Sequence, residues 1–154
     1  MAPALDTSAV IDRVLGGAPD VAAELHAAHD AAWASCEPAL LELTRLRIAM
    51  LLGNDAELAV RTSGGGVDEA TIAELSLWPT SPRFTERDRA CLTLVEQWLI
   101  DVADVSDEQC AAVAEHLGAD GLASYASAIL VLEQRQRLRL AWAQLFGSDL
   151  EVTA

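Results

Sequence analysis

The chain has 154 residues and a formal net charge of −14, from 24 acidic residues against ten arginines and no lysine. This charge repels phosphate backbones and anionic lipid surfaces, so we expect neither nucleic acid nor a membrane as a partner. The lack of lysine excludes Schiff-base chemistry. No apolar run approaches the roughly 20 residues that a membrane-spanning helix needs.

The N-terminal segment is predicted to begin a cytoplasmic domain. Its first 15 residues have no basic cluster and carry Asp6 and Asp12, which argues against a secretory signal or a mitochondrial presequence. Helical spacing and stop signals predict one helix over about 8–15 and a second over about 19–35. We assign residues 1–37 to N-terminal helices that pack on the core.

The rest of the chain is also predicted to be helical. Apolar residues recur at helical spacing, and no stretch alternates as a half-buried strand does. Start and stop signals predict these helices: 38–52, 54–61, 68–77, one that begins after Thr85, one from 106 to about 117, and one over about 121–146. The predicted fold class is all-α, a single-domain bundle of seven to eight helices, with a core over 38–146 and a tail over 147–154.

No metal site is predicted. The three cysteines, Cys36, Cys91 and Cys110, are widely spaced, which is typical of small buried hydrophobic residues and not of a disulfide framework or a metal cluster. His26 and His29 lie three residues apart and could place two ligands on one helix face, but two ligands are too few. We interpret these histidines as facing a pocket, where they would bind substrate.

One segment carries a family resemblance. The sequence ELTRLRI over 42–48 is followed by GNDAELAVR over 53–61. It resembles the carboxymuconolactone decarboxylase and alkylhydroperoxidase-D family, in which an E-L-x-R-L-R-like helix precedes a glycine and a short functional helix. Similar stretches at 81–90, 105–108 and 136–138 extend the resemblance from about 39 to 142. The resemblance implies an alkylhydroperoxidase-D-like fold and self-association into a trimer or hexamer.

The family's redox motif is missing from this chain. In the thiol branch the short helix has the form G-C-x-x-C-x-x-x-H, and a glutamate precedes it by 12 residues. That glutamate matches Glu42, but the two cysteines fall on Asn54 and Glu57 and the histidine on Arg61. A disulfide-exchange peroxidase needs an attacking thiolate and a resolving thiol. The resemblance therefore does not imply peroxidase activity.

The non-thiol branch, with forms such as G-x-E-H-E-L-A-x-H, matches better, except that Arg61 replaces its last histidine. It implies cofactor-independent acid–base chemistry, such as decarboxylation or isomerisation, on a small organic acid or ring compound. Arg61 would clamp a carboxylate. Glu42 or Glu57 would move a proton if burial raises its pKa, and Asn54 would bind substrate. We interpret the chain as a lyase- or isomerase-type enzyme.

Structural interpretations of the same residues stay open. Glu57 and Arg61 have the four-residue spacing of an ordinary helix salt bridge, and Glu42 could pair with Arg45 or Arg47. These pairings favour an alternative function, a catalytically inert scaffold that binds a ligand or forms oligomers. A minor alternative is an alkylhydroperoxidase-like antioxidant protein that uses a cysteine outside the family motif.

The polar run over 133–139 interrupts the last apolar helix. It is interpreted as a solvated face, as ion pairs between subunits, or as the polar lining of the pocket, in which case Gln134 would contact substrate. The glycines at 64–66 lack the phosphate-binding patterns of nucleotide sites, and we expect no cofactor.

Overall fold

The structure is a computed structural model that describes residues 7–147. These residues form seven α-helices and two short 3-10 helices, without a strand among them: α1 (Thr7–Val14), α2 (Pro19–Ser35), α3 (Pro38–Leu52), α4 (Asp55–Leu58), α5 (Glu69–Ala73), η1 (Leu75–Leu77), α6 (Glu86–Ile100), η2 (Val102–Asp104) and α7 (Asp107–Phe146). The prediction of an all-α bundle of seven to eight helices is confirmed. Residues 1–6, and 148–154 of the expected tail, lie outside the described residues.

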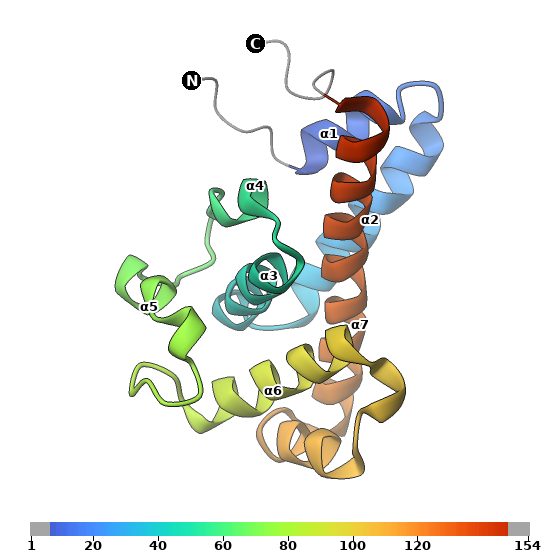
Figure 1. The fold of residues 1–154 in the computed structure, drawn as a ribbon. Helices are drawn as coiled ribbons and strands as arrows, with labels where there is room; N and C mark the ends of the chain where they lie inside the picture. Colours follow the sequence, from blue (N-terminus) through green and yellow to red (C-terminus); the bar gives the residue numbers. More distant parts are fainter. Residues whose placement is uncertain (1–6, 148–154) are drawn as a thin grey trace.

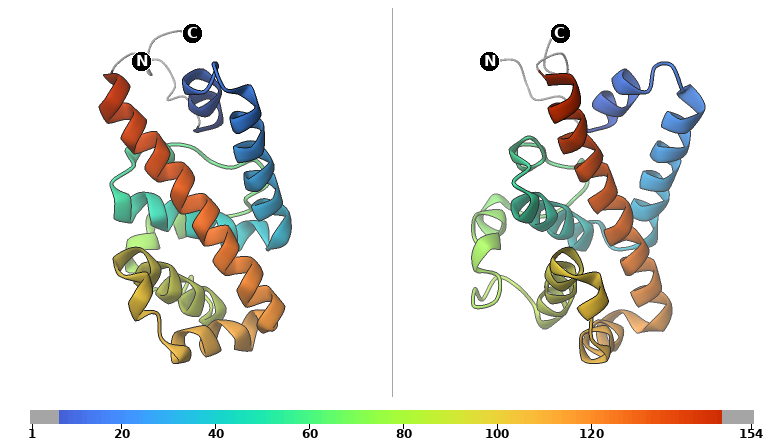
Figure 2. Two further views of the ribbon diagram at one scale, coloured as in Figure 1. Left: turned by 90° about the vertical axis from the view of Figure 1, so that its right-hand side faces the viewer. Right: turned by 45° about the vertical axis from the view of Figure 1, so that its right-hand side comes forward.

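The long helix α7 organises the fold. Helix α2 runs along it, and α1 lies beside its C-terminal end (Figure 1). In the right-hand view of Figure 2, α1 and α2 lie on one side of α7, and α3 to α6 lie on the other. Helix α3 packs against both α6 and α7. No helix within residues 7–147 combines the length and apolar character needed to cross a bilayer.

Helix α3 is buried because it contributes to two apolar clusters. Leu41 and Ile48 belong to a cluster shared with α2, α6 and α7, whereas Leu43 and Leu46 belong to a second cluster with η1 and α6. A helix that is apolar on all sides is stable only when protein surrounds it. Polar side chains on α3 must therefore find their partners inside the protein.

Helix α7 consists of two segments separated at Gly118. The first segment begins at a capping box formed by Ser106 and Gln109. Gly118 has φ 76° and ψ 171°, a backbone conformation that residues other than glycine rarely adopt. The predicted helix stop at Gly118 is confirmed. In Figure 2 the first segment lies at an angle to the second.

Helix α4 is shorter than predicted. It ends at Leu58, whereas the sequence predicts a helix that extends to Arg61. Arg45 caps this end, because its Nη1 donates to the Glu57 carbonyl and its Nη2 to the Val60 carbonyl, each at 2.8 Å. The last carbonyls of a helix have no partner within the helix, and here a side chain of α3 supplies the donors. Glu57 and Arg61 therefore do not share a helix face.

Candidate functional site

A polar cavity of about 340 Å³ lies where α1, α2, α3, α4 and α7 meet. Its volume is at the lower end of the roughly 300–1,000 Å³ that is usual for small-molecule sites. The lining residues are Thr7, Ser8, His29, Arg45, Glu57, Val60, Arg61, Thr62, Ser63, Leu132, Arg135 and Gln136. Among these described residues, Glu57 is the one carboxylate, and the lining also contains three arginines.

Arg45 lines this cavity, and all of its guanidinium N–H groups donate hydrogen bonds within the protein. Its Nε and Nη2 donate to the two carboxylate oxygens of Glu42 at 2.9 and 2.8 Å. Its Nη1 donates to Glu57 Oε2 at 2.8 Å. All three side chains are buried. One guanidinium thus compensates two buried carboxylates, which is the pairing that buried charges require.

Glu42 lies behind Arg45 and outside the cavity lining. Burial raises the pKa of its carboxyl, but the hydrogen bonds and charge of Arg45, together with the N–H of Thr62, outweigh that effect and hold the pKa below its usual value. The expectation that burial would raise this pKa toward neutrality is therefore wrong for Glu42. Its predicted pairing with Arg45 is confirmed.

A glycine-containing loop closes over Glu42. A Cβ atom added at Gly65 would lie 3.0 Å from Glu42 Cγ, so a larger residue would have to displace the Glu42 side chain. The same loop brings Val60, Arg61, Thr62 and Ser63 into the cavity wall. The loop thus covers one carboxylate and presents cationic and hydroxyl groups to the cavity.

Glu57 is the acidic group of the cavity. The Thr7 hydroxyl donates to its Oε1, and Arg139 Nη1 lies 3.8 Å from the same oxygen. Together with Arg45, these contacts hold the carboxylate in a fixed orientation at the junction of α1, α3, α4 and α7. Sequence reasoning identified Glu57, and the structure places it in the cavity.

Arg61 also lines the cavity, but its ion-pair partner differs from the expected one. Its Nε donates to Glu69 Oε1 at 2.7 Å and its Nη2 to Glu69 Oε2 at 3.1 Å. The interpretation of Arg61 as the partner of Glu57 is wrong, because the helix ends at Leu58 and Arg45 holds Glu57. The Arg61 side chain is 40% exposed, so it lies at the solvent side of the cavity.

The last helix contributes residues that sequence reasoning missed. Leu132, Arg135 and Gln136 line the cavity, whereas the predicted Gln134 is exposed. Two residues correspond to a rotation of about 200° around a helix, so Gln134 faces away from the side that Gln136 occupies. The spacing i, i+3, i+4 from Leu132 is the signal that could have identified the inner face.

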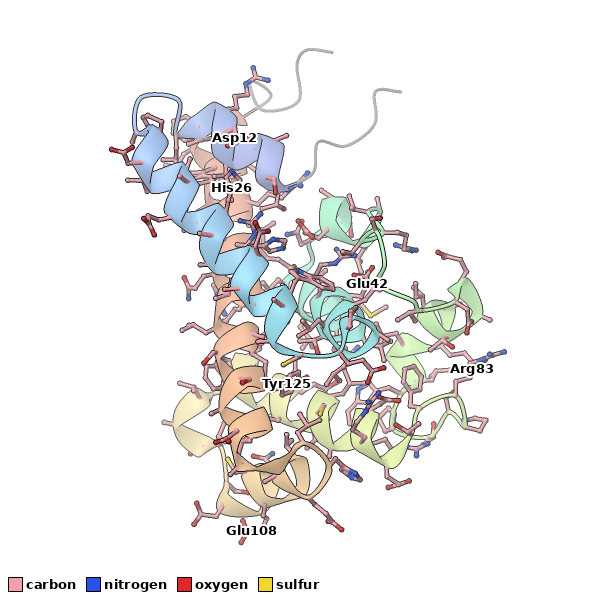
Figure 3. The ribbon with its side chains drawn as sticks, turned by 180° about the vertical axis from the view of Figure 1, so that it is seen from behind. Asp12, His26, Glu42, Arg83, Glu108 and Tyr125 are labelled. Atoms are coloured by element: carbon pink, nitrogen blue, oxygen red, sulfur yellow. The ribbon has the colours of Figure 1, made fainter. Side chains whose placement is uncertain are left out.

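The two histidines have separate environments. His29 lines the cavity, and its Nε2 accepts a hydrogen bond from Trp33 Nε1 at 2.9 Å. Burial and the nearby charge of Arg135 lower the pKa of His29, against the opposing effect of Asp30. His26 lies outside the cavity lining, and its Nε2 is 2.7 Å from Asp12 Oδ1. Figure 3 shows this pair bridging α1 and α2.

Asn54 has a local structural role and is not among the cavity-lining residues. Its Oδ1 accepts a hydrogen bond from the Glu57 N–H at 3.4 Å and so caps α4. A side-chain cap at this position orients the first turn. Asn54 therefore positions Glu57, in contrast to the expectation that it contacts substrate.

The cysteines lie apart from the cavity. Burial raises the pKa of the Cys91 thiol to about 12, while Cys36 and Cys110 are partly buried. Within residues 7–147, no three His, Cys, Asp or Glu side chains gather as candidate metal ligands.

Comparison with known proteins places the fold. No family model matches the sequence, and no curated protein matches it significantly. A crystal structure of a protein of unknown function from Agrobacterium tumefaciens, described as a candidate antioxidant defence protein AhpD, superposes with a TM-score of 0.73 and 20% identity over 91% of this chain and 94% of the other. At this identity the similarity shows the fold alone. The chain has an alkylhydroperoxidase-D-like all-α fold.

Proposed function

We propose that this chain is a thiol-free relative of the carboxymuconolactone decarboxylase and alkylhydroperoxidase-D proteins that binds a small organic acid in its cavity. The observation that carries the proposal is the composition of the lining. Arg61 and Arg135 line the cavity in addition to Arg45, which is paired with Glu42 and Glu57, although the whole chain has a net charge of −14. A local cationic cavity in an acidic protein favours an anionic ligand.

Arg61 is the group best suited to bind the acid. Its present partner, Glu69, has a side chain that is 73% exposed, and an exposed ion pair contributes little to stability. A ligand carboxylate can therefore replace Glu69 at small cost. The planar guanidinium can donate two parallel hydrogen bonds to that carboxylate.

Glu57 is the candidate proton-transfer group. It presents a carboxylate to the cavity, which Arg45 and Thr7 hold in place. His29 accepts from Trp33 at Nε2, so its neutral form carries the proton on Nδ1, which lies 3.6 Å from Asp30 Oδ1. We assign proton removal to Glu57 and a place in the cavity wall to His29.

The scaffold alternative has one observation in its favour. Glu57 already contacts Arg45, Thr7 and Arg139, and a buried carboxylate held by several donors can have a purely structural role. In this alternative the cavity binds an acid without converting it. Both the enzyme and the scaffold are therefore expected to bind the acid, and only the enzyme is expected to convert it.

Binding is tested with a panel of small mono- and dicarboxylates, by calorimetric titration of the wild-type chain, Arg61→Ala and the matched control Arg83→Ala. Arg83 forms a similarly exposed ion pair with Glu74 and lies at the outer edge of the molecule, away from Glu42 (Figure 3). Loss of a charged hydrogen bond of about 1.5–3 kcal/mol predicts affinity about ten- to a hundredfold weaker for Arg61→Ala. Arg83→Ala should bind like the wild type. Equal affinities in all three proteins would contradict this site.

A further inference from the structure

The side-chain amide of Gln136, a residue that lines the cavity, has an oxygen atom without a hydrogen-bond donor within residues 7–147. Gln136 is 2% exposed, and its Oε1 atom has no hydrogen-bond partner among the described residues. Its Nε2 donates to the Arg45 carbonyl at 2.8 Å. A carbonyl can only accept, so this bond fixes which amide atom is nitrogen and which is oxygen. The remaining oxygen is an acceptor without a donor among the described residues, and less than 1 Å² of its surface is accessible.

A buried acceptor without a donor destabilises the folded protein. Leaving a buried acceptor without a donor costs about 1–3 kcal/mol, and most buried polar atoms have partners. Gln136 lines the same cavity as Arg61 and Arg135. A small movement of the Gln136 side chain would bring its oxygen to the cavity, where a donor on the ligand would supply the missing hydrogen bond while Arg61 and Arg135 bind its acid group.

We infer that the ligand is a hydroxy acid, whose carboxylate is bound by the cavity arginines and whose hydroxyl donates to Gln136 Oε1. This inference rests on the proposed function and adds the second functional group of the ligand. The ligand's carboxylate cannot donate a hydrogen bond to Gln136 Oε1, because an ionised carboxylate has no proton to donate. The limited volume of about 340 Å³ requires both groups on one compact molecule.

The test compares matched acids that differ by one group: malate with succinate, and lactate with propionate and 2-methoxypropionate. Dissociation constants for the wild-type chain are measured by calorimetric titration. The hydroxy acid should bind about tenfold or more tightly than its deoxy analogue. The methoxy acid keeps the oxygen but cannot donate, so it should show no gain over propionate.

Two variants at neighbouring positions complete the test. Gln136→Met should abolish the preference for hydroxy acids, and Gln134→Met, on the exposed face of the same helix, should retain it. The deoxy acid serves as the internal control for folding and for anion binding in each variant. Should Gln136→Met fail to fold, the methoxy comparison in the wild type still decides the question.

The outcomes are distinguishable. If hydroxy and deoxy acids bind equally well, as they would if a water molecule satisfies Gln136, the hydroxy-acid inference is overturned and the proposed function stands. If neither hydroxy nor deoxy acids bind, the hydroxy-acid inference and the proposed function are both overturned. A preference that persists in Gln136→Met would assign hydroxyl recognition to another residue and overturn the role of Gln136.

Discussion

Arg45 Nη1 lies 2.8 Å from Glu57 Oε2, while the Nε and Nη2 atoms of the same guanidinium bind Glu42. Through this arrangement one side chain links a carboxylate behind the cavity to the carboxylate that lines it. Two more Arg45 hydrogen bonds bind backbone carbonyls at the C-terminal end of α4. Arg45 therefore determines both the stability of this region and the position of the candidate base.

Replacing Arg45 should destabilise the protein strongly. Arg45→Met leaves Glu42 without its counterion and leaves Glu57 with the more distant Arg139, and breaking a buried pair from one side costs about 3–5 kcal/mol. Urea denaturation at neutral pH measures this free energy of unfolding. Arg83→Met, at an exposed ion pair, is the control and should change stability little. A loss under about 1 kcal/mol for Arg45→Met would contradict the role given to Arg45.

Acid should weaken the protein through Glu42. The pKa of Glu42 is lowered from 4.5 in the folded state, so the unfolded chain binds its proton first. This contribution to stability is fully present above about pH 4.5 and is lost as the pH falls through the lower folded pKa. Unfolding free energies measured from pH 7 to pH 3 should fall less steeply for Glu42→Gln than for the wild type. Parallel curves would show that Glu42 is not held as a carboxylate.

Cys91 should resist thiol reagents in the folded protein. Burial raises its pKa to about 12, so almost no thiolate exists at pH 8, and the thiolate is the reactive form. Labelling with a chromogenic disulfide should modify Cys91 slowly in the native chain and rapidly after denaturation, with mass spectrometry locating the label. Rapid native labelling of Cys91 would revive the alternative of a peroxidase that uses this thiol.

The hydrogen bond from Trp33 to His29 should persist at mildly acidic pH. It needs a neutral imidazole, and burial together with Arg135 lowers the pKa of His29 below 6.5. A nuclear magnetic resonance titration of the His29 ring should give a midpoint below 6.5, and the Trp33 indole N–H signal should shift with the same midpoint. Because the folded pKa is depressed, this group's contribution to stability is lost as the pH falls below 6.5. A midpoint above 6.5 would contradict this environment.

Local signals in the sequence predicted the fold well. Ser106 and Thr85 begin helices as capping residues, and Gly118 ends one, because these effects depend on neighbours a few residues away. The end of α4 was predicted too late, since the helix ends at Leu58, where Arg45 from a different helix binds the carbonyls of Glu57 and Val60. A contact of that kind depends on tertiary packing, which local spacing does not show.

The candidate site was predicted only in part. Glu57, Arg61 and His29 lie in the cavity as the sequence suggested. The resemblance that identified Glu57 also indicated Glu42. Glu42 does not line the cavity, because both of its carboxylate oxygens are bound to Arg45. Gln136 was missed in favour of Gln134, because a polar run does not show which face of the helix is buried until the helix is packed.

Proton exchange at carbon, in an acid that binds the cavity, tests the role of Glu57 most directly. The acid is incubated with the protein in deuterated water, and deuterium incorporation is followed by nuclear magnetic resonance for the wild type, Glu57→Gln and Glu86→Gln, a control at an exposed glutamate. We expect incorporation with the wild type and Glu86→Gln, and its loss in Glu57→Gln while the acid still binds. Bound acid that exchanges no proton in the wild type, or exchanges equally fast in Glu57→Gln, would contradict acid–base chemistry by Glu57.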